Sequence, residues 1–221
     1  MVSTRRILGL FTGIALAAGT GLAAAPSASA SSHNCPPKPP AHAPGTASLA
    51  SVLLSDGNQF DHNWKDYDIV TEAVVAVLKA KPNSPVKVLT DGNVALTTFA
   101  PTDAAFQRLV KDISGKWVAK EKDVFGAVAG LGIDTVETVL LYHVVPGATI
   151  TAKDAAKANG ARLTTAQGGK ITVMVGRSGI RLGDADRNSP DPRVVAVDIN
   201  KGNKQIAHGI NRVLRPIDLP H

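Results

Sequence analysis

Apolar residues recur at helical spacing through the first half of the chain. The pattern is clearest over residues 68–79, where six apolar side chains form a broad stripe on one face: Ile69, Val70, Ala73, Val74, Val77 and Leu78. Such a stripe is typical of a helix that packs one face on a core. Shorter patterns predict helices over residues 48–54, 123–131 and 134–142, the last with Asp134 as its N-cap.

Residues 94–106 predict a buried strand that leads directly into a helix. The strand part ends near Phe99 and is rich in β-branched and aromatic residues. Pro101 should end the strand, and Thr102 or Asp103 should accept hydrogen bonds from the first N–H groups of the helix. Three residues then return to the core at helical spacing: Phe106, Leu109 and Val110.

The second half of the chain predicts short strands separated by turns rich in Gly, Asn and Pro. These strands are expected over residues 162–166, 170–175, 180–182, 194–199 and 206–214. Because helices come first and strands afterwards, the order predicts an α+β fold. We expect an antiparallel β-sandwich in the C-terminal half and a helical layer from the N-terminal half. Residues 86–89 fit either a strand or a helical cap.

The N-terminus predicts export. Arg5 and Arg6 precede an apolar run over residues 7–22, and an Ala-x-Ala site ends at Ala30. This layout is that of a secretory signal peptide over residues 1–30. An uncleaved membrane anchor is the alternative, and the Ala-x-Ala site favours cleavage. We therefore expect a secreted, extracellular protein, with retention at the cell surface as the open alternative.

The domain organisation follows from composition. The proline-rich residues 31–47 are expected to be a linker, and residues 48–219 a single domain. Cys35 is the one cysteine in the chain, so no internal disulfide can form. It could pair between chains or anchor the protein to a surface, but an unpaired thiol in the linker is the preferred interpretation.

Charge and motifs exclude several classes of function. The net charge is +6, but Lys and Arg are not clustered as they are in nucleic-acid-binding surfaces, so no nucleic-acid partner is expected. No catalytic, metal-binding or phosphate-binding motif occurs, so we expect neither enzymatic activity nor a cofactor or metal ion. Asp184, Asp186 and Asn188 are spaced like the start of a calcium loop. The turn Gly and the bidentate Glu of such loops are absent, which favours a polar hairpin loop.

Three segments resemble, in order, the signatures of fasciclin-like domains. They are residues 97–106 (Thr-Thr-Phe-Ala-Pro-Thr-Asp-Ala-Ala-Phe), residues 141–147 (Leu-Tyr-His-Val-Val-Pro-Gly) and residues 206–216. The last departs from the family pattern at Ala207 and Asn211, and the family's preceding Asn-Gly turn is replaced. The resemblance covers about residues 48–219. It implies a wedge of strands with helices along one side, in a secreted bacterial single-domain member.

The resemblance also implies a function. Fasciclin-like domains serve in cell adhesion and matrix contact, which implies a non-catalytic module that binds an extracellular protein, cell-envelope or matrix component. Tyr142 and His143 match the Tyr-His region that is linked to integrin binding in animal relatives, so they are the candidate binding residues. The preferred alternative is structural: both residues, like His208, pack into the core and bond backbone groups.

A second class of function stays open. An exported protein that binds a glycan or small ligand would use a cleft near Trp64 or Trp117. We expect both rings to anchor loops to the core, where they could not stack on a ligand. Their exposure therefore distinguishes the two classes.

Overall fold

The structure, a computed structural model, describes residues 43–217, which are mostly helical in their first part and mostly β-strand in their second. The predictions for the signal peptide, for Cys35 and for most of the linker lie outside the described residues, as do residues 218–221. The helices are α1 Leu49–Leu53, α2 Asp68–Ala80, α3 Asp103–Ser114, α4 Glu121–Ala129, α5 Ile133–Tyr142 and α6 Ala152–Ala155, with 3₁₀ turns η1 Leu54–Asp56 and η2 Pro85–Thr90.

The strands form two sheets. The strands are β1 Leu96–Pro101, β2 Val144–Pro146, β3 Arg162–Thr164, β4 Lys170–Gly176, β5 Gly179–Gly183, β6 Val194–Ile199 and β7 Gln205–Ile210. One sheet has the order β2-β1-β7-β6 and the other the order β3-β4-β5. The predicted α+β fold is confirmed.

One pairing in the first sheet is not antiparallel. β1 and β7 run parallel, with Leu96 opposite Gln205 and Pro101 opposite Ile210. Parallel strands need a long crossover connection, and here it comprises most of the domain. Turn residues in the sequence indicate only which neighbouring strands form hairpins, so nothing local specified this pair.

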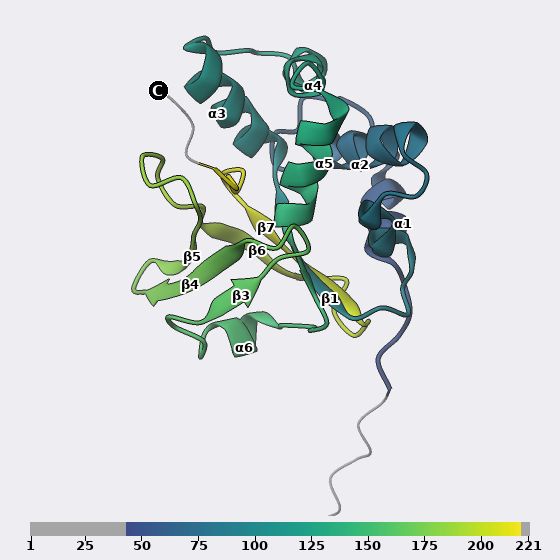
Figure 1. Ribbon diagram of the computed structural model, residues 1–221, viewed down its shortest axis with the longest axis vertical. Helices are drawn as coiled ribbons and strands as arrows, with labels where there is room; N and C mark the ends of the chain where they lie inside the picture. The colour runs from purple at the N-terminus through teal and green to yellow at the C-terminus, as the bar shows by residue number, and fades with distance from the viewer. Residues whose placement is uncertain (1–42, 218–221) are drawn as a thin grey trace, which may run out of the picture. The chain divides into compact units, whose positions relative to one another are not determined.

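The first sheet lies between two cores. Every residue of β1 and of β7 is buried, so these two central strands have no solvated face. Helices α1 to α5 lie on one side of this sheet and strands β3 to β5 on the other (Figure 1). The helical core includes Leu49, Ile69, Val77, Leu96, Phe106 and Ala207, and the core between the sheets includes Phe99, Tyr142, Ile171, Leu182 and Ile210.

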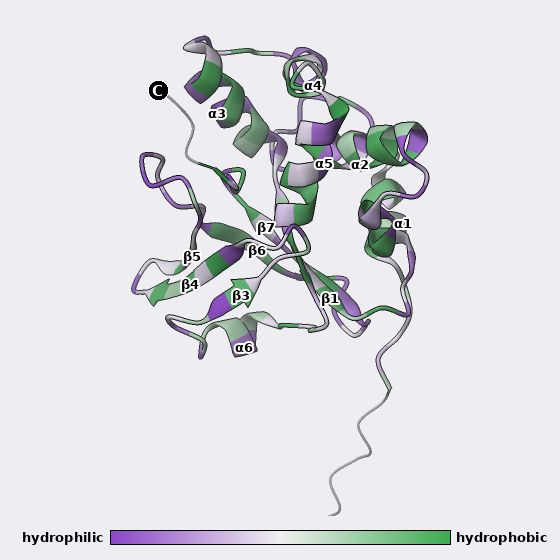
Figure 2. Cartoon of the chain, in the orientation of Figure 1, coloured by the Kyte–Doolittle hydropathy of each residue, from purple (hydrophilic) through white to green (hydrophobic). Residues whose placement is uncertain are grey.

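Helix positions follow the apolar periodicity closely. Hydrophobic and hydrophilic residues alternate along α3 and α5, as expected for helices with one face on a core (Figure 2). α2 begins at the predicted Asp68, and residues 86–89 belong to the 3₁₀ turn η2. α5 begins one residue earlier than expected, so Gly132 is its N-cap and Asp134 lies in its first turn. Neither α6 nor β2 was expected from the sequence.

Candidate functional site

An apolar groove lies between α3, α5 and the C-terminal segment 213–217. Its volume is about 400 Å³. Three of its aliphatic side chains are unusually exposed for their size: Ile113 (48 %), Leu131 (41 %) and Ile217 (62 %). The polar residues that line it are Asp134, Thr135, Thr138, Gln167 and Arg215. Such a surface can take apolar side chains from outside the domain.

His143 lies behind this groove and joins two of its walls. Its side chain is 3 % exposed. Nε2 accepts a hydrogen bond from the N–H of Leu214 (2.9 Å), so Nδ1 carries the proton and donates to the carbonyl of Val139 (2.7 Å). Burial lowers the pKa of His143 to about 4, which keeps the ring neutral. α5 and the C-terminal segment are therefore held together by one uncharged imidazole.

Tyr142, the last residue of α5, attaches the end of this helix to the second sheet. Its side chain is 1 % exposed, and its hydroxyl donates to the carbonyl of Lys170 at 2.9 Å. Burial, with a contribution from the charge of Asp184, raises the pKa of Tyr142 to about 12. Gly169 packs on the ring, since a Cβ there would lie 2.7 Å from its Cε2 atom. Tyr142 thus connects α5 to β4 and to the turn before it.

The C-terminal wall of the groove is anchored by a buried arginine. Arg215 is 5 % exposed and forms ion pairs with Asp186 (2.9 Å) and Asp112 (2.5 Å). Its backbone N–H donates to Asp184 (2.8 Å). Burial raises the pKa of Asp184 to about 6.

The polar loop that resembled a calcium loop has a structural role. The second oxygen of Asp186 accepts hydrogen bonds from the N–H groups of Asn188 (3.0 Å) and Ser189 (3.2 Å). Because Arg215 and these backbone donors occupy the carboxylates of the loop, it holds the C-terminal segment in place.

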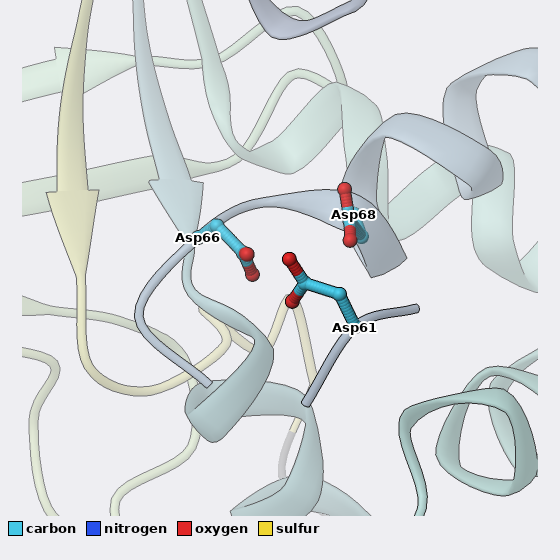
Figure 3. A group of neighbouring side chains, drawn as sticks. All are labelled: Asp61, Asp66 and Asp68. Atoms are coloured by element: carbon cyan, nitrogen blue, oxygen red, sulfur yellow. The ribbon is translucent and has the colours of Figure 1, made fainter. Parts of the chain in front are cut away.

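A second polar site lies where α2, α3 and α4 begin. Asp61, Asp66 and Asp68 point toward one another from the loop before α2 and from its first residue (Figure 3). Asp66 also lies close to Asp103 and Glu121, with one oxygen of each of these three within 4.8 Å of the others. These five acidic residues are here called the acidic cluster.

The predicted capping of α3 by the side chain of Thr102 or Asp103 was wrong. Thr102 is the N-cap residue of α3, but no side chain accepts a capping hydrogen bond from the first N–H groups of this helix. Asp103 instead accepts a hydrogen bond from the N–H of Ile69, in the first turn of α2, at 3.0 Å. Asp103 is fully buried, and this burial, with repulsion from Asp66 and Glu121, raises its pKa to about 8. Sequence reasoning missed the cluster because its members come from three separate segments.

The Fasciclin domain family model matches residues 70–216. The chain belongs to the fasciclin domain family. No curated protein matches it. Among solved structures, it is similar to the FAS1 domain pair of the insect cell adhesion molecule fasciclin I, with a TM-score of 0.53 and 18 % identity. The match covers 77 % of this chain and 51 % of that one, so the chain spans about half of the domain pair.

In this fasciclin domain the two candidate binding residues are enclosed. Tyr142 and His143 come together at the end of α5, but both side chains face the interior. Their hydrogen bonds to backbone groups match the structural alternative. A direct contact with a partner would require this helix end to open, so their role in binding stays a prediction. His208 is also buried, with Nε2 bonded to the carbonyl of Ile150 at 2.8 Å.

The two tryptophans of the fasciclin domain differ. Trp64 packs partly buried against the helical core, as expected. Trp117 is 56 % exposed, so the prediction that it anchors a loop to the core was wrong. The ammonium of Lys111 lies 5.6 Å from the centre of the Trp117 ring, a cation–π contact.

Among the described residues, no single helix is long and apolar enough to cross a membrane. α4 and α5 have sufficient length and apolar composition only when taken together, and the chain bends by 104° between them.

Proposed function

We propose that this protein is an exported, non-catalytic adhesion module that binds apolar side chains of an extracellular protein in the groove between α3 and α5. The apolar groove itself is the observation that carries the proposal, because exposed aliphatic side chains surround it. Membership of a family known from cell adhesion proteins supports the adhesive role. The predicted signal peptide over residues 1–30 supports export.

The groove favours a protein partner over a glycan. None of the described residues that line it is aromatic, whereas sugar rings are commonly bound by stacking on aromatic faces. Its aliphatic lining suits a Leu, Ile or Met anchor, and its polar rim could bond the backbone beside that anchor. Tyr142 and His143 would serve binding indirectly, by holding the groove walls.

Retention of cell-envelope or matrix proteins on the immobilised protein, residues 31–221, tests this proposal. Ile113→Glu and Leu131→Glu place a charge in the groove at exposed positions, so they should abolish retention and leave folding intact. Val195→Glu is the matched control, since Val195 is 54 % exposed on β6, away from the groove. Equal retention by wild type and both groove variants would contradict the proposal.

A glycan or small-ligand binder remains the second candidate because Trp117 is exposed. One face of its ring is already engaged by Lys111, and Trp117 does not line the groove. Binding to a glycan array that is lost in Trp117→Ala and kept in Leu131→Glu would favour this candidate.

A further inference from the structure

The acidic cluster contains buried carboxylate oxygens that no protein donor satisfies. Asp103 and Glu121 are 0 % and 1 % exposed. One oxygen of each accepts a backbone hydrogen bond, from Ile69 in the case of Asp103 and from His62 in the case of Glu121 (2.9 Å). The other oxygen of each, and one oxygen of Asp66, has no hydrogen-bond partner. Orphaned buried acceptors are rare and indicate a missing partner.

Among the described residues, these three members of the cluster also lack a cationic partner. In the described part of the chain, no Lys or Arg forms an ion pair with Asp66, Asp103 or Glu121. Isolated carboxylates are costly to bury unless they are paired, bind a metal ion or keep a proton, as the raised pKa of Asp103 indicates here. A cation between these three residues would remove both deficits at once.

The spacing of the oxygens suits a single ion. Two oxygens that bind the same Ca²⁺ at about 2.4 Å can be at most about 4.8 Å apart. The ligand oxygens of Asp66, Asp103 and Glu121 all lie within 4.8 Å of one another. Asp66 is shared with the group that Figure 3 shows, in which Asp61 is exposed and offers a path from solvent.

We propose that Asp66, Asp103 and Glu121 bind a divalent cation, Ca²⁺, at the start of α3 and α4. All the ligands are hard oxygen donors, which disfavours zinc. Ca²⁺ tolerates irregular coordination, whereas Mg²⁺ requires a near-ideal octahedron. Water, Asp61 and Asp68 can supply the remaining ligands.

The ion would fasten the loop before α2 to two other helices. The three proposed ligands come from that loop, from the first residue of α3 and from the first residue of α4. The positive ends of the helix dipoles oppose a cation here. We therefore expect a dissociation constant of about 10⁻⁴ to 10⁻³ M, the range of extracellular calcium modules.

Calcium titration of EDTA-treated protein tests the site. About 10 mM Ca²⁺ should raise the melting temperature by about 4 °C or more, and EDTA should reverse the shift. Mg²⁺ at the same concentration should raise it less. Tb³⁺ should show luminescence sensitised by the nearby Trp64 or Tyr67, and Ca²⁺ should displace it. A wild-type protein with neither a thermal shift nor displaceable terbium luminescence would overturn the proposal.

Three variants locate the ion. Glu121→Gln and Asp103→Asn keep an oxygen for the backbone donors but replace a carboxylate ligand of the ion with a neutral amide, so each should weaken Ca²⁺ binding about tenfold or more. Asp191 lines one polar pocket together with Asp184 and Asp186 of the loop that resembles a calcium loop. Asp191→Asn is therefore the control for that loop, and it should respond as the wild type does. A response lost in Asp191→Asn but kept in Glu121→Gln would place the ion in that loop and overturn the assignment.

Discussion

At the scale of single residues, Phe99 is a buried aromatic side chain of the core between the sheets. It is 4 % exposed and packs beside His208, with ring centres 6.0 Å apart. Phe99→Ala should lower the free energy of unfolding by about 3–5 kcal/mol, because the loss of apolar contacts adds to the cost of a cavity. Urea denaturation measures the change. Val195→Ala on the exposed face of β6 should alter it little, and a similar small change in Phe99→Ala would contradict the packing argument.

His143 makes stability depend on pH. Its pKa is about 4 in the folded protein and near its usual 6.5 when unfolded. The unfolded chain therefore binds a proton first as the pH falls, and the free energy of unfolding should drop by about 3 kcal/mol between pH 6.5 and 4. A proton on Nε2 would also face the N–H donor of Leu214.

Comparison with His143→Gln isolates this dependence. Glutamine offers a donor and an acceptor but does not titrate in this range. The variant should lose stability less steeply between pH 6.5 and 4 in denaturation series. Parallel pH profiles of the two proteins would exclude His143 as the source.

At the scale of elements, β7 depends on the absence of a side chain at Gly209. A Cβ there would lie 2.1 Å from the Tyr67 hydroxyl and 2.9 Å from the Cβ of Ala196 on β6. Gly209→Ala should therefore destabilise the domain by about 1–3 kcal/mol, the usual cost of overpacking. Adding Tyr67→Phe should restore part of this loss, because it removes the nearest atom.

Gly126 provides the matched control. It lies inside α4, and a Cβ there would meet nothing within 4 Å. Gly126→Ala should stabilise the domain by up to about 1 kcal/mol through helix propensity. Thermal melts of Gly209→Ala and Gly126→Ala should therefore shift in opposite directions. A lower melting temperature in both would indicate a general response to an added methyl group, not a steric conflict at β7.

At the scale of the whole molecule, the folded contacts begin within the segment predicted as a linker. Gly45 pairs with Asn203 beside β7 and exchanges backbone hydrogen bonds with Gly202 and Lys204. The N–H of Ala47 also bonds Asn203 at 3.0 Å. A chain that starts at residue 48 should therefore melt several degrees below one that starts at residue 43. Equal melting temperatures would show that residues 43–47 add nothing to stability.

The elements that were predicted well are those that local sequence specifies. The apolar stripe of α2 sets both its length and its buried face, because helical periodicity needs only neighbouring residues. Short strands between Gly-rich turns likewise marked β4 and β5. The three fasciclin signatures combine such local patterns, and they were sufficient for the family.

The two proposed sites were decided only by tertiary structure. The sequence alone determined the helix-then-strand order, the α+β class and the fasciclin family. It did not determine that β1 pairs with β7, that Asp103 caps α2, or that the acidic cluster and the groove exist. Each of these joins segments far apart in the chain. Periodicity and capping rules describe interactions between residues a few positions apart in the chain. These contacts depend instead on which distant surfaces pack together.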